Sequence, residues 1–185
     1  MSFASKYQTD LLAALGQLNL EKVEQAIEWL RNCRDSGGHI FVCGNGGSAS
    51  TASHFACDMV KGASYQRAKR FRILALTDSL PTVTAYSNDV GYEVVFVEQL
   101  KNFARPGDVV LAMSGSGNSP NTLRAVEYAA ALDCATIALT GGDGGRLGAM
   151  AQLNIQVAAS HMGRIEDLHL IVCHMIAYYF METEE

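Results

Sequence analysis

The sequence predicts an α/β fold, namely a three-layer αβα sandwich around a parallel five-stranded sheet, preceded by two N-terminal helices. Short apolar runs alternate with longer segments of helical spacing, which is typical of parallel strands joined by right-handed helical crossovers. The apolar runs are nearly continuous, as strands are when helices cover both faces of their sheet. No internal repeat or low-complexity linker interrupts the alternation, so we expect a single domain of residues 1–185.

The first two helices are expected over residues 4–18 and 20–35. In the second, Val23, Ala26, Ile27 and Leu30 recur at helical spacing before a Gly-Gly pair ends the pattern. Both helices precede the first strand and have no part in a βαβ unit. We therefore expect segment 1–36 to be a helical extension that packs on other subunits.

The five strands are short apolar runs bounded by glycine or polar residues. They are predicted over residues 39–44, 71–77, 108–114, 134–140 and 153–159. Helical patterns separate the strands and close the chain, over residues 48–62, 80–87, 92–104, 119–132, 144–150 and 163–182.

The amino-acid composition limits the classes of ligand and of cellular location that we expect for the protein. The chain is 49% hydrophobic and 18% charged, which predicts a sizeable folded core. A net charge of −5 without a basic block argues against nucleic acid, which Lys and Arg clusters hold, but allows a small phosphorylated ligand. The five cysteines form no CxxC pair, so we expect reduced, buried thiols in a cytoplasmic protein. The chain starts without a signal-peptide pattern, and no apolar run approaches the roughly 20 residues of a membrane span.

Two strand-to-helix loops are alike and give the strongest functional signal. Residues 43–48 read CGNGGS and residues 114–119 read SGSGNS. Ligands of open parallel sheets bind at the carboxyl ends of strands, where glycines allow close approach and helix N-termini offer N–H groups. With serine hydroxyls added, the loops predict a phosphate site without Lys or Arg, although either loop alone could be a capped turn. A third glycine turn, residues 140–145, is interpreted as a tight connection.

The ionisable residues suggest metal or proton chemistry. His54 and Asp58 stand four residues apart in the helix after the first loop, so they share a face and form half of a candidate metal site. The last helix carries Glu166 and His174. A histidine buried in such an apolar stretch needs a hydrogen-bond partner or a role in proton transfer or metal binding. Because these two lie about 12 Å apart along a helix, one subunit or two could supply them to one metal.

Taken in order, these segments resemble the phosphoheptose isomerases of the sugar isomerase (SIS) domain superfamily. The resemblance rests on GNGGSA at 44–49, SNDVGY at 87–92, SGSGNS at 114–119, TGGDGG at 140–145 and RIEDLH at 164–169, with His54, Asp58 and His174. It implies a homotetramer with active sites between subunits. It also implies conversion of sedoheptulose 7-phosphate to D-glycero-D-manno-heptose 7-phosphate, for the heptose of bacterial surface polysaccharides such as lipopolysaccharide.

The resemblance further implies a role for each matching residue. Loop residues would hold the phosphate, namely Gly46, Gly47, Ser48, Ser114, Gly115, Ser116 and Ser119. Other polar residues would contact the sugar, namely Asn45, Asp89 and Glu166. Zinc is implied at His54, Asp58, Glu166 and His174, with Asp58 as the base and His174 as the acid.

The chain departs from the family pattern at several of these places. Asp58 stands where glutamate is usual, Glu166 where glutamine is usual, and Gly163 where aspartate is usual; Gly115 removes a loop hydroxyl. These differences leave the sugar and the divalent metal open. The alternatives are an isomerase of another ketose phosphate, or a non-catalytic SIS protein that binds the replication initiator. The acid at position 58 and His174 favour the enzyme.

Overall fold

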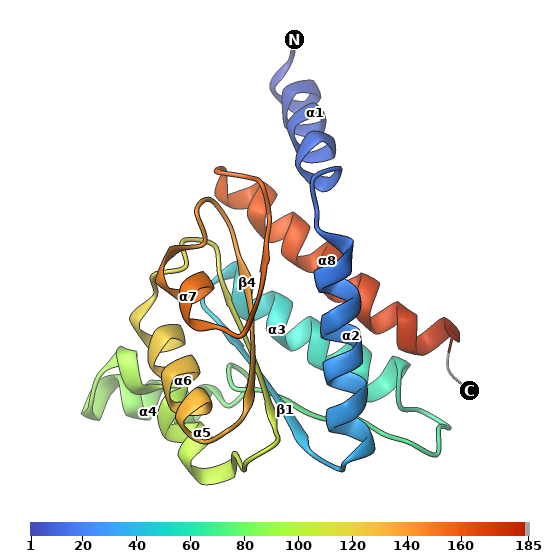
Figure 1. Ribbon diagram of the computed structural model, residues 1–185. Coiled ribbons are helices and arrows are strands. Elements are labelled where there is room, and N and C mark those ends of the chain that lie inside the picture. Colours follow the sequence, from blue (N-terminus) through green and yellow to red (C-terminus); the bar gives the residue numbers. More distant parts are fainter. Residues whose placement is uncertain (184–185) are drawn as a thin grey trace.

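A computed structural model, which describes residues 1–183, confirms the predicted sandwich of one parallel sheet between two helical layers (Figure 1). The strand order is β2-β1-β3-β4-β5, and every neighbouring pair is parallel. The strands are β1 (His39–Gly44), β2 (Arg72–Ala75), β3 (Val109–Ser114), β4 (Ala135–Thr140) and β5 (Leu153–Gln156). The outermost strands, β2 and β5, are each three residues shorter than predicted.

Successive residues of β1 explain why its sequence is apolar throughout. Ile40 belongs to one buried core and Phe41 to the other, because neighbouring side chains of a strand point to opposite faces of the sheet. Three helices cover the face of Ile40: α2 (Leu20–Asp35), α3 (Gly47–Cys57) and α8 (Met162–Thr183). Four helices lie on the face of Phe41: α4 (Leu80–Asp89), α5 (Val97–Phe103), α6 (Pro120–Ala131) and α7 (Gly145–Met150).

Two predicted helices differ in detail from the structure. The segment predicted as one helix over 92–104 is a 3-10 turn, η2 (Tyr92–Val94), followed by α5. Helix α3 ends at Cys57 and continues as one π-helical turn, η1 (Asp58–Gly62). Gly62 passes so close to Met181 of α8 that a Cβ there would overlap the methionine side chain. Thus a close contact between two helices accompanies the change in helical pitch at Asp58.

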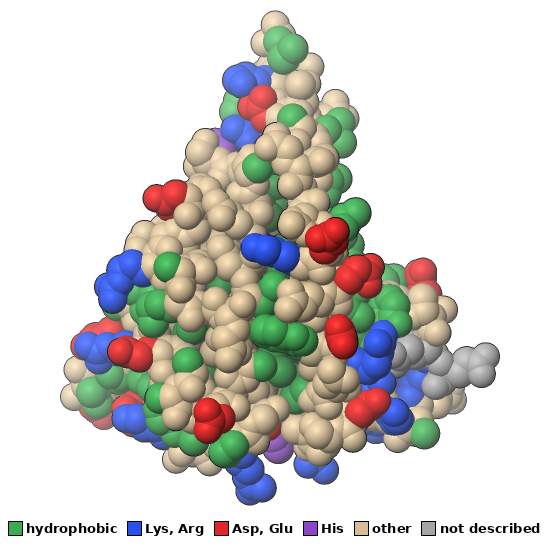
Figure 2. Space-filling view, in the orientation of Figure 1, with side chains coloured by type: hydrophobic (Ala, Val, Ile, Leu, Met, Phe, Trp, Pro, Cys, Tyr) green, Lys and Arg blue, Asp and Glu red, His purple; other side chains and the backbone are tan. Residues whose placement is uncertain are grey.

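Helix α1 (Phe3–Leu15) extends away from the body of the molecule (Figure 1). It is held to the start of α8 by Tyr7, whose hydroxyl donates to the Asp167 carboxylate at 2.6 Å. Arg164 of α8 also lies 3.3 Å from the carboxylate of Asp10. The end of the helix nearest α2 packs on the core through Leu11, Ala14 and Leu15, whereas its outer end is exposed and carries apolar side chains (Figure 2).

All five cysteines are free thiols, as expected. Four are buried, but Cys57 is exposed on α3, contrary to the expectation of buried thiols. In the part of the chain that the structure describes, no helix combines the length and the apolar character needed to cross a membrane.

Candidate active site

The two glycine-serine loops line one pocket. Strands β1 and β3 are neighbours, with Gly44 opposite Met113, so the loops that follow them leave the same edge of the sheet. The strand order reverses between these strands, which is where open parallel sheets bind ligands. The pocket has a volume of about 250 Å³ and is lined by Asn45, Gly46, Gly47, Ser48, Met113, Ser114, Gly115, Ser116, Ser119, Met162 and Glu166.

Local backbone geometry directs both loops into this pocket. Gly46 has a φ of +56°, a conformation that favours glycine, and α3 begins at the next residue. In the second loop, Ser119 stands at the N-cap of α6 without capping it; its hydroxyl lies 3.1 Å from the hydroxyl of Ser114 instead. The two helix N-termini and the serine hydroxyls thus converge on the pocket, and an anion there would meet N–H and O–H donors.

The third glycine turn and the α7 helix that follows it hydrogen-bond to the backbone of the second loop, in keeping with the interpretation of this turn as a tight connection. The amide of Leu147 donates to the Gly117 carbonyl at 2.8 Å, and the amide of Gly141 donates to the Gly115 carbonyl at 3.2 Å. The Asn118 side chain adds a bond to the Ser116 carbonyl at 2.8 Å. The backbone of the SGSGNS loop is therefore fixed before any ligand binds.

Three ionisable side chains converge between α3 and α8. Nε2 of His54 lies 3.2 Å from Oδ2 of Asp58 and 3.0 Å from Nε2 of His174. Nε2 of His174 is 3.7 Å from the same Asp58 oxygen. The helical spacing predicted the first pair, and the packing of α8 on α3 adds His174.

This cluster fits a divalent metal. Its three ligand atoms lie within 4.8 Å of one another, as donors do around an ion with bonds of about 2.0–2.2 Å. Two imidazole nitrogens and a carboxylate suit zinc and other first-row divalent ions. The side chain of His54 is 51% exposed and that of His174 is 41% exposed, so the cluster opens to the surface of the single chain.

The structure places Glu166 and Asp89 apart from this cluster. The Glu166 carboxylate lies against Gly47, where an added Cβ would overlap it, so a larger residue at position 47 would displace this side chain. Its predicted role as a metal ligand stays a prediction. Asp89 is exposed at the end of α4, accepts a bond from the Asn88 side chain at 2.7 Å, and lines a separate hollow with Tyr86. Within one chain it does not line the loop pocket.

Sequence reasoning assigned no role to Asn121, Tyr92 or His169, although Tyr92 and His169 end two of the segments that carry the resemblance. Asn121 and Tyr92 both bond to the side chain of Asn45. His169 of α8 is buried, and burial lowers its pKa to about 4 against a weaker opposing effect of the Thr140 backbone. Neither ring nitrogen has a hydrogen bond of normal geometry to a described residue. The signals in the sequence were an asparagine in a first helical turn, the tyrosine that ends SNDVGY, and a histidine in an apolar helix.

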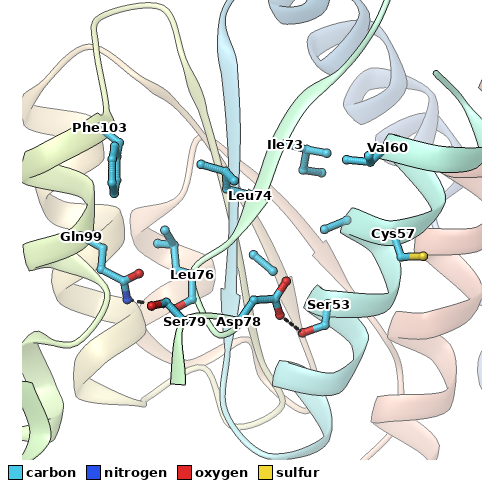
Figure 3. A pocket seen from close by; sticks show the side chains of 12 residues that line it. Ser53, Cys57, Val60, Ile73, Leu74, Leu76, Asp78, Ser79, Gln99 and Phe103 are labelled. Atoms are coloured by element: carbon cyan, nitrogen blue, oxygen red, sulfur yellow. Dashed lines mark hydrogen bonds between the residues drawn. The ribbon is translucent and has the colours of Figure 1, made fainter. Parts of the chain in front are cut away.

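A larger hollow, of about 460 Å³, lies between α3 and α5 beside the edge strand β2 (Figure 3). Its lining is mostly apolar and includes Leu74 and Phe103. Its polar side chains bond within the protein: Ser53 donates to Asp78, and Nε2 of Gln99 donates to the Leu76 carbonyl at 2.9 Å. None of the predicted site residues lines this hollow, so the loop pocket and the histidine cluster remain the candidate site.

Comparison with known proteins agrees with this geometry. A family model of the SIS domain matches residues 5–141. A probable phosphoheptose isomerase of Thermoplasma acidophilum is 37% identical over 173 residues, which are 94% of each chain. A phosphoheptose isomerase of Helicobacter hepaticus is 38% identical over 83% of this chain and 78% of its own.

Solved structures give the same result. Phosphoheptose isomerase GmhA from Neisseria gonorrhoeae matches with a TM-score of 0.88 and 33% identity, covering 96% of both chains. A phosphoheptose isomerase from Francisella tularensis matches with a TM-score of 0.90 and 29% identity, covering 99% of this chain and all of that one. The fold and the site thus define an enzyme of the sugar isomerase class. Within that class, the chain belongs to the phosphoheptose isomerase family.

Proposed function

We propose that this protein interconverts sedoheptulose 7-phosphate and D-glycero-D-manno-heptose 7-phosphate. One observation carries the proposal: the loop pocket and the histidine cluster lie along the same helix, α3. His54 follows Ser48 by six residues, about 9 Å along a helix axis. With carbon–carbon bonds of about 1.5 Å, C1 of an extended heptose 7-phosphate lies about 10 Å from its phosphorus. A phosphate in the pocket would therefore bring C1 and C2 to the cluster.

The reaction moves a proton between C1 and C2, which requires a base at carbon and an acid at oxygen. We assign the base to Asp58 and the acid to His174, whose reactive atoms lie 3.7 Å apart. Ser48, Ser114, Ser116 and Ser119 would hold the phosphate with the N-termini of α3 and α6. Asn45 would contact sugar hydroxyls, and Asp89, which does not line the pocket of its own chain, would do so from a second subunit.

His54, Asp58 and His174 would hold a divalent metal, for which we propose zinc, and Glu166, which lines the loop pocket of its own chain, would join them only from a second subunit. When bound, the metal supplies polarisation of the sugar oxygens at C1 and C2. Asp58 would be a weaker base when it also binds the metal. The other assigned residues act without it: they fix the phosphate, orient the sugar and transfer the proton.

A direct assay tests the proposal. Purified protein is incubated with ketose phosphates of five, six and seven carbons, with and without zinc, and the aldose product is measured. We expect the seven-carbon substrate to react fastest, since shorter sugars held by phosphate would stop short of His54. An isomerase of another ketose phosphate would instead prefer a shorter sugar. An inert protein on the whole panel would contradict the enzyme and leave the replication-initiator adaptor, which the converging cluster disfavours.

We also propose that residues 1–185 form one domain and that, of segment 1–36, helix α1 packs on other subunits of a homotetramer, since α2 is buried against the chain's own sheet. Phe3 is 78% exposed and Leu12 is 60% exposed on α1, which supports a partner for this helix. Light scattering of the full chain should give four subunits, and the double change of Phe3 and Leu12 to Ser should lower that number. An unchanged mass would contradict the role of α1.

The cytoplasmic location stays a prediction.

A further inference from the structure

The side chain of Asn45 is held by two residues that have no assigned role. Its Nδ2 donates to Oδ1 of Asn121 at 2.9 Å, and its Oδ1 accepts from Nδ2 of Asn121, also at 2.9 Å. The hydroxyl of Tyr92 donates to the same Oδ1 at 2.8 Å. Asn121 is 1% exposed, so this amide pair joins the first loop to α6 in the protein interior.

A backbone amide fixes the orientation of both side chains. The amide of Thr122 lies 2.9 Å from Oδ1 of Asn121 and can only donate, so an oxygen and not an NH₂ group must face it. The other end of the Asn121 side chain is then the donor Nδ2. Opposite this pair, Asn45 must present its own Nδ2 to the Asn121 oxygen and its own oxygen to the Asn121 nitrogen. Rotating the Asn45 amide by 180° would place oxygen against oxygen.

The hydrogen-bonding capacity of Asn45 is therefore nearly used up. A carbonyl oxygen accepts two bonds, and Asn121 and Tyr92 supply both. An NH₂ group donates two bonds, and one goes to Asn121. One N–H is left, and Asn45 lines the loop pocket.

We propose that Asn121 and Tyr92 are positioning residues that make Asn45 a single N–H donor to the substrate. This inference rests on the proposed function, because it assumes that Asn45 contacts the sugar phosphate. The subsite then recognises an oxygen lone pair, from a hydroxyl or from the phosphate ester. It offers no acceptor for a hydroxyl proton. Tyr92 also ties the segment after α4 to the loop, next to the Glu93–Arg124 pair at 3.7 Å.

A double-mutant cycle tests whether Tyr92 acts through Asn45. Tyr92→Phe removes only the hydroxyl of a side chain at the surface, so the protein should still fold. We expect it to raise KM for sedoheptulose 7-phosphate about 2- to 10-fold, the value of one hydrogen bond, while kcat changes less. In the Asn45→Ala background the same change should leave KM unaltered, because the group it positions is gone. Tyr65→Phe, at another exposed tyrosine, is the matched control and should change nothing.

Nuclear magnetic resonance of the Asn45 side-chain amide tests the inference without activity. In the free wild-type protein, the proton donated to buried Asn121 should exchange slowly with solvent, and the other should exchange fast. Sedoheptulose 7-phosphate should shift the fast proton only. Two equally fast protons in the free protein, or equal KM effects of Tyr92→Phe in both backgrounds, would overturn the inference even for an active isomerase. An inert wild type with the expected exchange pattern would overturn the proposed function alone.

Discussion

Replacing Glu166 with Gln should strengthen the binding of inorganic phosphate to the metal-free protein. The Glu166 carboxylate lies at the first residue of α3 and lines the same pocket as the serine loops. The pocket lining includes no Lys or Arg to offset this charge. A negative side chain thus shares the pocket with the anion that the loops are proposed to bind.

The size of the effect follows from Coulomb's law. Two unit charges about 6 Å apart repel by about 0.7 kcal/mol in water and by about 2.8 kcal/mol at an effective dielectric constant of 20. The pocket is open to solvent on one side, so we expect a value between these limits, about 1.4 kcal/mol. That corresponds to a Kd about tenfold lower in Glu166→Gln. Salt should reduce the difference, since the repulsion is screened.

Titration calorimetry with inorganic phosphate, after treatment with a chelator, measures this Kd. Glu24→Gln is the matched control, because it removes the same charge from the exposed face of α2, away from the pocket. Its Kd should equal that of the wild type. If Glu166→Gln bound phosphate no better than the wild type, the carboxylate would not face the anion, and the position assigned to the phosphate would be wrong.

Three further predictions concern the cluster and the core. Asp58→Asn should lower kcat by about 10²- to 10⁴-fold and leave the Kd for inorganic phosphate unchanged, because the loop pocket is remote from this side chain. Chelation should abolish activity and zinc should restore it, whereas His54→Asn should weaken zinc binding measured against a coloured chelator. Burial holds the pKa of His169 at about 4, below the 6.5 of an exposed imidazole, so unfolding takes up a proton below pH 6.5. Stability should therefore fall by about 2 kcal/mol between pH 7 and pH 5, and urea titrations of His169→Gln should show a smaller fall.

Much of the fold could be predicted because local signals mark its elements. Glycine and serine after each apolar run set the ends of β1 and β3, and helical spacing predicted α2 and α3. The order of the strands carries no such signal. Only the pairing of β1 with β3, seen in the register of Gly44 and Met113, brings the two loops to one pocket. The sequence predicted two phosphate-binding loops, but only the tertiary structure brings them next to each other.

In the candidate site too, the sequence predicts pairs that are close along the chain but not contacts between distant segments. His54 and Asp58 could be paired from helical geometry alone, since residues four apart share a face. His174 joins them because α8 packs on α3, and no spacing along the chain predicts that contact. Asn121 was missed for a related reason: asparagine in a first helical turn is common, and its partner Asn45 lies 76 residues away.

Both ends of the candidate site lie on packed helices, so the distance between them would determine which length of substrate fits. Helix α3 carries Ser48 at the pocket and His54 at the cluster, and α8 carries Glu166 and His174 in the same order. Ala52, between the two ends, and Phe55, directly after His54, are fully buried against the core. A helix packed in this way cannot shorten to bring the cluster toward a smaller sugar, because its rise of about 1.5 Å per residue is fixed by its hydrogen bonds. Discrimination by chain length therefore needs no contact specific to the seventh carbon. In the proposed reaction it follows from holding the phosphate at the start of α3 and the proton-transferring cluster toward its end.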